Sequence, residues 1–348
     1  MRPDRGRWPV WGHDAAVASL RQAIVADRVR HAYLFAGPEG VGKTTLATAF
    51  AQALLCTAPV SPGEPCGECL ACRKVARGVH PDIQTFSLER QADASASKGA
   101  KNTSLTIETV RELCGTAALR PMEGRWRIIL LEDAETLQDV AQEALLKTLE
   151  EPPSFLLLIL LSNDAEVLLP TIRSRCQIVE LRPVPRAAIR DGLIATGCEP
   201  ELAEELAGLA GGAPGWAIAA SRNPALVEER RAAVARALDW IQSSGYERLV
   251  TAVRLGDSFS RRRAETFAEL DTLLGVWRDA LLLRTGHTEY VTFRGQAERL
   301  AELTREWPVP AIHRAVCSVQ TCLLDLEANV RPRLAMEAMV LQWPTKHS

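Results

Sequence analysis

One segment limits the possible folds of this chain more than any other. Residues 37–44 read Gly-Pro-Glu-Gly-Val-Gly-Lys-Thr and match the pattern G-x-x-x-x-G-K-[ST]. An apolar run at residues 32–36 precedes them, and residues 43–55 follow with apolar side chains at helical spacing. A strand, a glycine-rich loop and a helix in this order let backbone N–H groups converge on phosphate oxygens at a helix N-terminus. The segment therefore predicts a phosphate-binding loop.

Two polar residues at the start of the helix have the side chains that nucleotide chemistry needs. Lys43 is expected to contact the outer phosphates, and Thr44 to offer its hydroxyl to magnesium. The alternative is a glycine-rich turn without a ligand, which the correct flanking elements disfavour. We predict a site for ATP and Mg2+ whose loop residues are Gly37, Gly40, Gly42, Lys43, Thr44 and Thr45.

Acidic residues follow a second apolar run, residues 128–131, which ends in Glu132-Asp133. Related ATPases usually have the order Asp-Glu at the end of this strand. Glu132 is expected near magnesium, and Asp133 where the group that orients the attacking water belongs. Because Asp133 is one methylene shorter than glutamate, and an error of about 1 Å can cost ~100-fold in rate, we expect weak or absent hydrolysis. The alternative is that both acids lie at a helix N-terminus, where negative charge is favourable.

A third apolar run, residues 156–161, is followed by Ser162 and Asn163. A polar side chain at the end of a strand beside the phosphate site can sense the terminal phosphate of a nucleotide. Asn163 is therefore predicted to line the site.

Four of the nine cysteines have the spacing C-x9-C-x2-C-x2-C. Four thiolates can close a tetrahedral zinc site that leaves no open coordination position. Cys56, Cys66, Cys69 and Cys72 are therefore predicted to hold a structural Zn2+, which would stabilise a loop with little core of its own. Free cysteines without metal are the alternative. Residues 1–10 contain no apolar segment typical of a secretory signal, so we expect a reducing, cytoplasmic location.

Strands alternate with helices in the first half of the chain, which predicts a parallel sheet covered on both faces. Pro183 and Pro185 mark a boundary, beyond which the pattern is helical and no strand is expected. The predicted fold is α/β followed by all-α. Its parts are a P-loop domain at residues 1–182 with a cysteine module at 56–72, a small helical lid at 183–222 and a helical C-terminal domain at 223–348.

Composition supports two further expectations. The residues between Ser87 and Ser104 are mainly small and polar, which predicts a mobile loop. The longest apolar run, residues 155–161, is far shorter than the roughly 20 residues that cross a bilayer. We therefore expect no membrane association.

Three further motifs accompany the phosphate loop and the cysteines. These are His31-Ala32-Tyr33-Leu34-Phe35, the run Ala-Leu-Leu-Lys-Thr-Leu-Glu-Glu-Pro-Pro at residues 144–153, and Ser174-Arg175-Cys176. In combination the motifs, which cover about residues 12–182, resemble the bacterial clamp-loader subunits of the AAA+ family. The resemblance implies an AAA+ fold for this part of the chain and a helical collar, which holds a ring of subunits together, for residues 223–348.

The resemblance also implies a role for Arg175. In this family the arginine of Ser-Arg-Cys is an arginine finger that reaches the ATP site of the neighbouring subunit. Without the resemblance, Arg175 is most simply interpreted as part of a surface ion pair. A guanidinium supplied in trans ties hydrolysis to ring assembly. The implied partners are the tau/gamma and delta subunits, with the sliding clamp and primed DNA bound through the assembly.

Two branches of the family share these motifs: the tau/gamma motor and delta-prime, often called the stator. His80-Pro81-Asp82 and Glu132-Asp133-Ala134-Glu135 resemble delta-prime, and Trp216 stands where the motor would have a sensing arginine. These details favour a delta-prime subunit of the bacterial DNA polymerase III holoenzyme, which helps ATP-dependent clamp loading. The tau/gamma ATPase is the alternative.

A zinc-dependent nucleic-acid-binding module with a vestigial phosphate loop is a third hypothesis. The basic cluster beside the cysteines consists of Arg73, Lys74 and Arg77, and no aromatic residues interleave with it to stack on bases. The formal net charge of −2 also gives no global positive field. Both observations disfavour this hypothesis.

Overall fold

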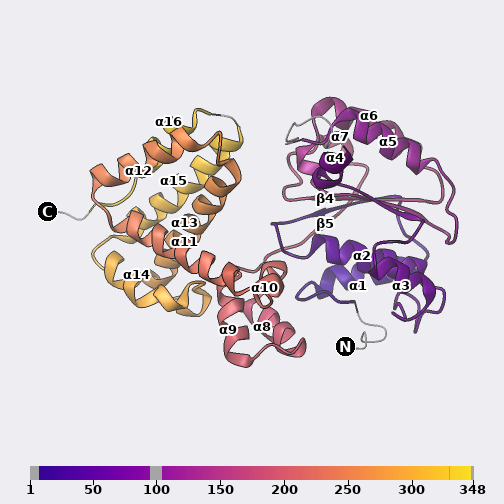
Figure 1. The fold of residues 1–348 in the computed structure, drawn as a ribbon, viewed down its shortest axis with the longest axis horizontal. Coiled ribbons are helices and arrows are strands. Elements are labelled where there is room, and N and C mark those ends of the chain that lie inside the picture. The colour runs from indigo at the N-terminus through magenta and orange to yellow at the C-terminus, as the bar shows by residue number, and fades with distance from the viewer. Residues whose placement is uncertain (1–7, 95–103, 329, 346–348) are drawn as a thin grey trace. The chain divides into compact units, whose positions relative to one another are not determined.

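The computed structural model describes residues 8–94, 104–328 and 330–345 (Figure 1). The described residues divide into two compact units. The first is drawn from Met1–Gly192 and Gly212–Gly215, and the second from Leu193–Gly211 and Trp216–Ser348. The first contains the sheet and the second is helical, so the predicted order of α/β followed by all-α is confirmed.

A five-stranded parallel sheet forms the centre of the first unit, in the order β2-β3-β4-β1-β5. Its strands are β1 (Ala32–Ala36), β2 (Ile83–Phe86), β3 (Arg127–Leu131), β4 (Leu156–Ser162) and β5 (Gln177–Glu180). β1 lies between β4 and β5, with Phe35 paired to Leu161 on one side and to Val179 on the other. Every residue of β1, β3 and β4 is buried. Burial on both faces explains why these strands are largely continuous apolar runs.

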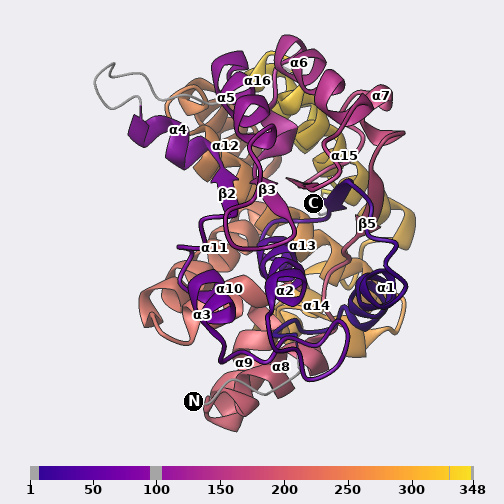
Figure 2. The same cartoon turned by 90° about the vertical axis from the view of Figure 1, so that its right-hand side faces the viewer.

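Helices cover both faces of this sheet (Figures 1 and 2). Because successive strand residues point to opposite faces, Leu158 packs with Leu113 and Leu145, whereas Tyr33 meets Phe50 edge-on, with ring centroids 5.2 Å apart. One face carries α1 (Asp14–Val25), α2 (Lys43–Leu55) and α3 (Leu70–Ala76); the other carries α4 (Leu88–Ala94), α5 (Ile107–Ala117), α6 (Asp139–Glu150) and α7 (Pro170–Arg173).

Two elements of this unit differ from the sequence prediction. Strand β2 is not predicted, because it has four residues of which three are only partly buried, so no apolar run marks it. The prediction of a loop between Ser87 and Ser104 is wrong for Leu88–Ala94, which form the helix α4. There the Ser87 hydroxyl accepts a hydrogen bond from the backbone N–H of Arg90, as at a helix N-cap. The rest of that expectation, residues 95–103, lies outside the described residues.

In the part of the chain that the structure describes beyond Pro183, there are helices and no strand, as predicted. The second unit has a core around the fully buried Trp277, which packs against Trp307 and Trp343. The helices are α8 (Arg186–Ala195), α9 (Pro200–Leu209), α10 (Pro214–Ala220), α11 (Pro224–Gln242), α12 (Gly245–Ser258), α13 (Arg263–Arg284), α14 (Ala297–Thr304), α15 (Val309–Glu327) and α16 (Pro332–Val340), with single 3-10 turns η2 (Thr288–Tyr290) and η3 (Arg294–Gln296).

None of the described helices combines the length and the apolar character that crossing a membrane requires.

Candidate nucleotide site and candidate metal site

The glycine-rich loop leaves β1 at the edge of the sheet where β3 and β4 also end, because parallel strands finish on the same side. Gly37 is required at the exit from β1, since a Cβ there would lie 2.1 Å from the backbone oxygen of Leu181. Gly42, the N-cap of α2, has a φ of 113°, a conformation that favours glycine. The loop thus has the strand before it and the helix after it that the sequence predicts.

Oxygen atoms around the loop hold the ammonium group of Lys43. Nζ donates to the backbone oxygen of Gly37 at 2.6 Å, to that of Pro38 at 3.1 Å and to Oδ1 of Asn163 at 2.7 Å. Burial lowers the pKa of Lys43, while nearby carboxylates, Glu135 foremost, raise it. A phosphate that displaced these neutral oxygens would meet a partly desolvated cation, where charge–charge attraction is stronger than in water.

Thr44 and Glu132 are in direct contact. Oγ1 of Thr44 donates to Oε1 of Glu132 at 3.1 Å. Burial raises the pKa of Glu132, whereas the hydrogen bond from Thr44 lowers it. A hydroxyl and a carboxylate side by side beside a phosphate loop are oxygen ligands of the kind that Mg2+ prefers, so these two residues fit that ion.

Asp133 has a different environment. Its backbone is left-handed, with a φ of 55°, which is uncommon for a residue other than glycine. Its Oδ2 accepts a hydrogen bond of 3.1 Å from the backbone N–H of Leu88, the first residue of α4. One carboxylate oxygen of Asp133 is therefore bound to a helix N-terminus. The alternative that this acidic pair caps the helix after it is not what the structure shows, because the Asp133 side chain makes no capping hydrogen bond in the turn that follows it and Glu132 faces Thr44.

Asn163 follows β4 and connects Lys43 to Glu135. Its Nδ2 and its backbone N–H donate to the two carboxylate oxygens of Glu135, at 2.6 and 3.2 Å. Glu135 lies on the 3-10 turn η1 (Ala134–Thr136) and is absent from the predicted site residues. Its signal in the sequence is an acid three positions after Glu132, in the segment that follows the strand.

These groups line a cleft with a volume of about 400 Å³. Gly215 also belongs to it and is not predicted from the sequence. Its N–H donates to the backbone oxygen of Gly40 at 2.9 Å, and a Cβ on Gly215 would lie 3.1 Å from that oxygen. The lining residues are Glu39, Gly40, Gly42, Lys43, Thr44, Thr45, Glu132, Asp133, Glu135, Leu161, Asn163 and Gly215. Gly37 contributes only its carbonyl group, through Lys43.

Arg175 does not line this cleft. Its guanidinium donates to Oε1 of Glu150, at the end of α6, at 2.7 Å and to the backbone oxygen of Thr171 at 2.8 Å. The Arg175 side chain is 35% exposed. Arg175 therefore has a carboxylate partner within its own chain and keeps part of its surface accessible.

The four predicted cysteines come together at the end of α2 and the start of α3. Their sulfur atoms all lie within 4.8 Å of one another, and Sγ of Cys56 is 3.6 Å from Cys66 and 3.9 Å from Cys69. Tetrahedral bonds of about 2.3 Å to zinc place sulfurs roughly 3.8 Å apart. Burial raises the pKa of Cys69, but hydrogen bonds from Cys72 and Thr57 outweigh it and lower that pKa to about 6. The cluster can therefore hold a metal ion, and its spacing fits Zn2+.

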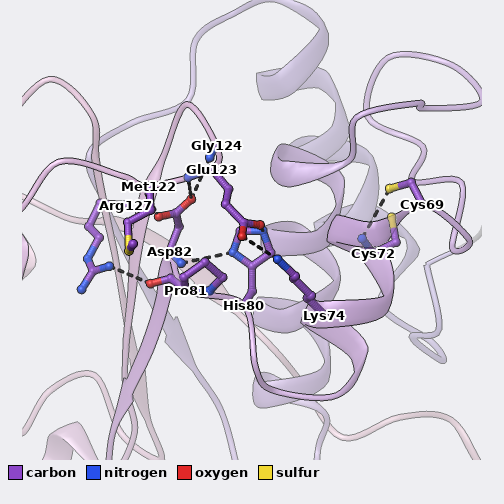
Figure 3. A network of polar contacts seen from close by, with 10 residues as sticks. All are labelled: Cys69, Cys72, Lys74, His80, Pro81, Asp82, Met122, Glu123, Gly124 and Arg127. Carbon is purple, nitrogen blue, oxygen red and sulfur yellow. Dashed lines mark hydrogen bonds and ion pairs between the residues drawn. The ribbon is translucent and has the colours of Figure 1, made fainter.

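A polar network joins the cysteine module to the sheet (Figure 3). Asp82 is fully buried, and its carboxylate accepts three backbone N–H groups, from Met122, Glu123 and Gly124, at 2.5 to 2.9 Å. Burial raises the pKa of Asp82, but these hydrogen bonds outweigh it and lower the pKa. Lys74, on the same helix as Cys72, forms an ion pair of 2.5 Å with Glu123. The loop before β3 is thereby tied to the cysteine module.

A phosphate loop between β1 and α2, acids after β3 and an asparagine after β4, the strand that lies between β3 and β1, define a P-loop protein with a parallel sheet. The family model described as "DNA polymerase III, delta subunit" matches residues 12–185. Together with the similarity of the curated relatives described next, this match shows that the chain belongs to that family.

The relatives cover the chain to different extents. The "DNA polymerase III subunit delta'" of Pseudomonas aeruginosa is 33% identical over 90% of this chain and 91% of its own length. The protein of the same description from Bacillus subtilis is 27% identical over 92% of this chain and 93% of its own. The "DNA polymerase III subunit gamma/tau" of Mycobacterium bovis is 36% identical, but over 55% of this chain and 31% of its own length. The chain resembles these delta' proteins over nine-tenths of its length and the gamma/tau protein over about half.

Proposed function

We propose that this chain is a delta-prime subunit of a bacterial clamp loader, a cytoplasmic component of the DNA polymerase III holoenzyme that helps ATP-dependent loading of the sliding clamp onto primed DNA. The observation that carries the proposal is the similarity to two delta' proteins over nine-tenths of the chain. The tau/gamma alternative is disfavoured because the similarity to that branch covers only about half of this chain and about a third of the relative.

The cleft is proposed to bind ATP with Mg2+ but to hydrolyse it poorly. Lys43 would hold the outer phosphates, while Thr44 and Glu132 would hold the metal ion. Efficient hydrolysis also needs a carboxylate free to orient water, and one oxygen of Asp133 is bound to the N–H of Leu88. The chain is therefore proposed to act mainly through its neighbours.

Arg175 is proposed to act in trans, on a nucleotide held by an adjoining tau/gamma subunit. Two features support this role: the guanidinium is partly exposed, and its hydrogen bond to the backbone oxygen of Thr171 fixes its orientation. A side chain that is positioned but accessible can approach a neighbour's phosphate at little cost in ordering.

The remaining parts are proposed to be structural. Zn2+ bound by the four cysteines would order the loop between α2 and α3 without catalytic chemistry, because four thiolates leave no open position. Residues 1–182, 183–222 and 223–348 are proposed as the AAA+ domain, the lid and the collar that joins the ring with tau/gamma and delta.

Reconstitution with tau/gamma and delta tests this proposal. The wild-type chain should co-purify with both partners, and Arg175→Ala should lower the ATPase rate of the assembly by ~100-fold or more. Arg173→Ala is the matched control, because Arg173 lies two positions away and has its own ion pair with Glu166. Normal turnover of the Arg175→Ala assembly would remove the trans role.

The chain's own cleft is tested separately, with the isolated protein. Lys43→Ala should abolish nucleotide binding, because it removes the cation that holds the outer phosphates. Substantial ATPase activity of the isolated wild-type chain, lost in Lys43→Ala, would support the motor alternative instead.

A further inference from the structure

We propose that Glu135 makes the cleft select a nucleoside diphosphate over a triphosphate, by fixing the amide of Asn163 in the orientation that is unfavourable for a terminal phosphate. This inference rests on the proposed nucleotide binding and adds a specificity to it. Its basis is the hydrogen-bonded chain from Glu135 through Asn163 to Lys43.

The orientation of the Asn163 amide follows from its two neighbours. A carboxylate only accepts hydrogen bonds and an ammonium only donates them. The Nδ2 group of Asn163 therefore faces Glu135 at 2.6 Å, and Oδ1 faces Nζ of Lys43 at 2.7 Å. The reversed amide would place oxygen against the carboxylate and NH2 against the ammonium, so both contacts would become repulsive.

This orientation matters for the outermost phosphate alone. In a phosphate loop the backbone N–H groups hold the inner phosphates, and the lysine reaches the outer ones. Asn163 contacts the ammonium of Lys43, the residue that reaches the outer phosphates. There it presents an acceptor oxygen, whereas a phosphate oxygen needs a donor.

The charge of Glu135 acts in the same direction. Its carboxylate lines the cleft and is the foremost of the nearby acids that stabilise the Lys43 ammonium. A third phosphate brings more negative charge toward this carboxylate than a second phosphate does, so the repulsion falls mainly on the triphosphate. Both effects leave the binding of a diphosphate in the loop nearly unchanged.

Glu135→Gln separates these effects from packing, because glutamine has the same shape without the charge. Its amide can also donate to Oδ1 of Asn163, so residue 135 no longer opposes the reversed orientation. The NH2 group of Asn163 then faces the Lys43 side, where a phosphate oxygen can accept from both groups. The full-length chain would be titrated calorimetrically with Mg-ADP and with a non-hydrolysable Mg-ATP analogue. Glu39→Gln is the matched control, because Glu39 lines the same cleft and also raises the pKa of Lys43.

Glu135→Gln should tighten binding of the triphosphate by about tenfold, the scale of one charge-assisted hydrogen bond, and change the Kd of ADP by less than about threefold. Glu39→Gln should shift both Kd values by a similar factor. An equal shift for both nucleotides in Glu135→Gln, no shift at all, or a selective shift in Glu39→Gln would overturn the inference while nucleotide binding stands. Failure of the folded wild type and the Gln variant to bind either nucleotide would overturn both proposals.

Discussion

The guanidinium of Arg175 and the carboxylate of Glu150 form an ion pair of 2.7 Å that joins the end of α6 to the segment after α7. The two residues belong to different motifs of the sequence, the Glu-Glu-Pro-Pro run and Ser-Arg-Cys. Their contact, together with the hydrogen bond from Arg175 to the backbone oxygen of Thr171, fixes the direction in which the guanidinium points. We predict that Glu150 is a positioning residue for the proposed arginine finger.

Glu150→Gln should therefore reduce the ATPase rate of the reconstituted assembly several-fold, because Arg175 loses the charged partner that orients it. The stability of the isolated chain should change by less than about 1 kcal/mol, since a part-exposed ion pair contributes little. Rate and thermal unfolding are measured on the same preparations. Glu151→Gln, the neighbouring acid, is the control, and an equal loss of rate in both variants would contradict the positioning role.

Removal of one cysteine ligand should release the metal. Cys72 is fully buried in the cluster, and Cys72→Ser is expected to lower the zinc content from one equivalent per chain to near zero. Small zinc modules gain about 10 kcal/mol or more from the metal, so the segment between α2 and α3 should become sensitive to protease. Metal content is measured by elemental analysis, with Cys317→Ser on the exposed side of α15 as the control. Wild-type protein that contains no zinc and still resists protease would contradict the metal site.

Asp82→Asn should destabilise the first unit by about 2–3 kcal/mol, because a buried amide oxygen replaces a carboxylate that accepts three N–H groups. Urea unfolding measures the change. Asp27→Asn is the matched control: Asp27 pairs with Arg125 at the surface, so its loss should cost less than about 0.5 kcal/mol. Equal losses of unfolding free energy in the two variants would show that the buried Asp82 network stabilises the unit no more than a surface ion pair does.

Acid should weaken the same network through His80. Burial lowers the pKa of His80 below its ordinary value of 6.5, outweighing the opposite effect of Asp82 and Glu123, while Lys74 lowers it further. The folded state then binds this proton more weakly than the unfolded state. The stability contribution is complete above pH 6.5 and is lost as the pH falls from there toward the folded-state pKa.

The loss from His80 should reach at most about 1.4 kcal/mol per pH unit. Nδ1 of His80 accepts a hydrogen bond of 3.2 Å from the backbone N–H of Asp82. In His80→Asn the amide oxygen can accept this bond, but the side chain cannot be protonated. The free energy of unfolding of this variant should therefore depend less steeply on pH between 7 and 5, at equal zinc content. The exposed His287→Asn serves as control, and identical slopes for wild type and His80→Asn would refute the assignment.

The sequence by itself determined the features that contiguous residues encode. The phosphate loop, the buried strands and the four cysteines each depend on spacing within a short stretch, because backbone geometry fixes what neighbours along the chain can do. The same reasoning missed β2, whose four residues lack an apolar run and gain their place from pairing with β3.

Only the tertiary structure decided which distant side chains meet. Glu135 reaches Asn163, Asp82 holds the loop before β3, and Asp133 binds the N–H of Leu88 across wide gaps in sequence. Such pairs leave no periodic pattern in the sequence, because the distance between the two side chains depends on how the whole sheet and its helices are arranged. The sequence thus specified the groups that could bind a nucleotide, and the fold fixed how each of them is oriented.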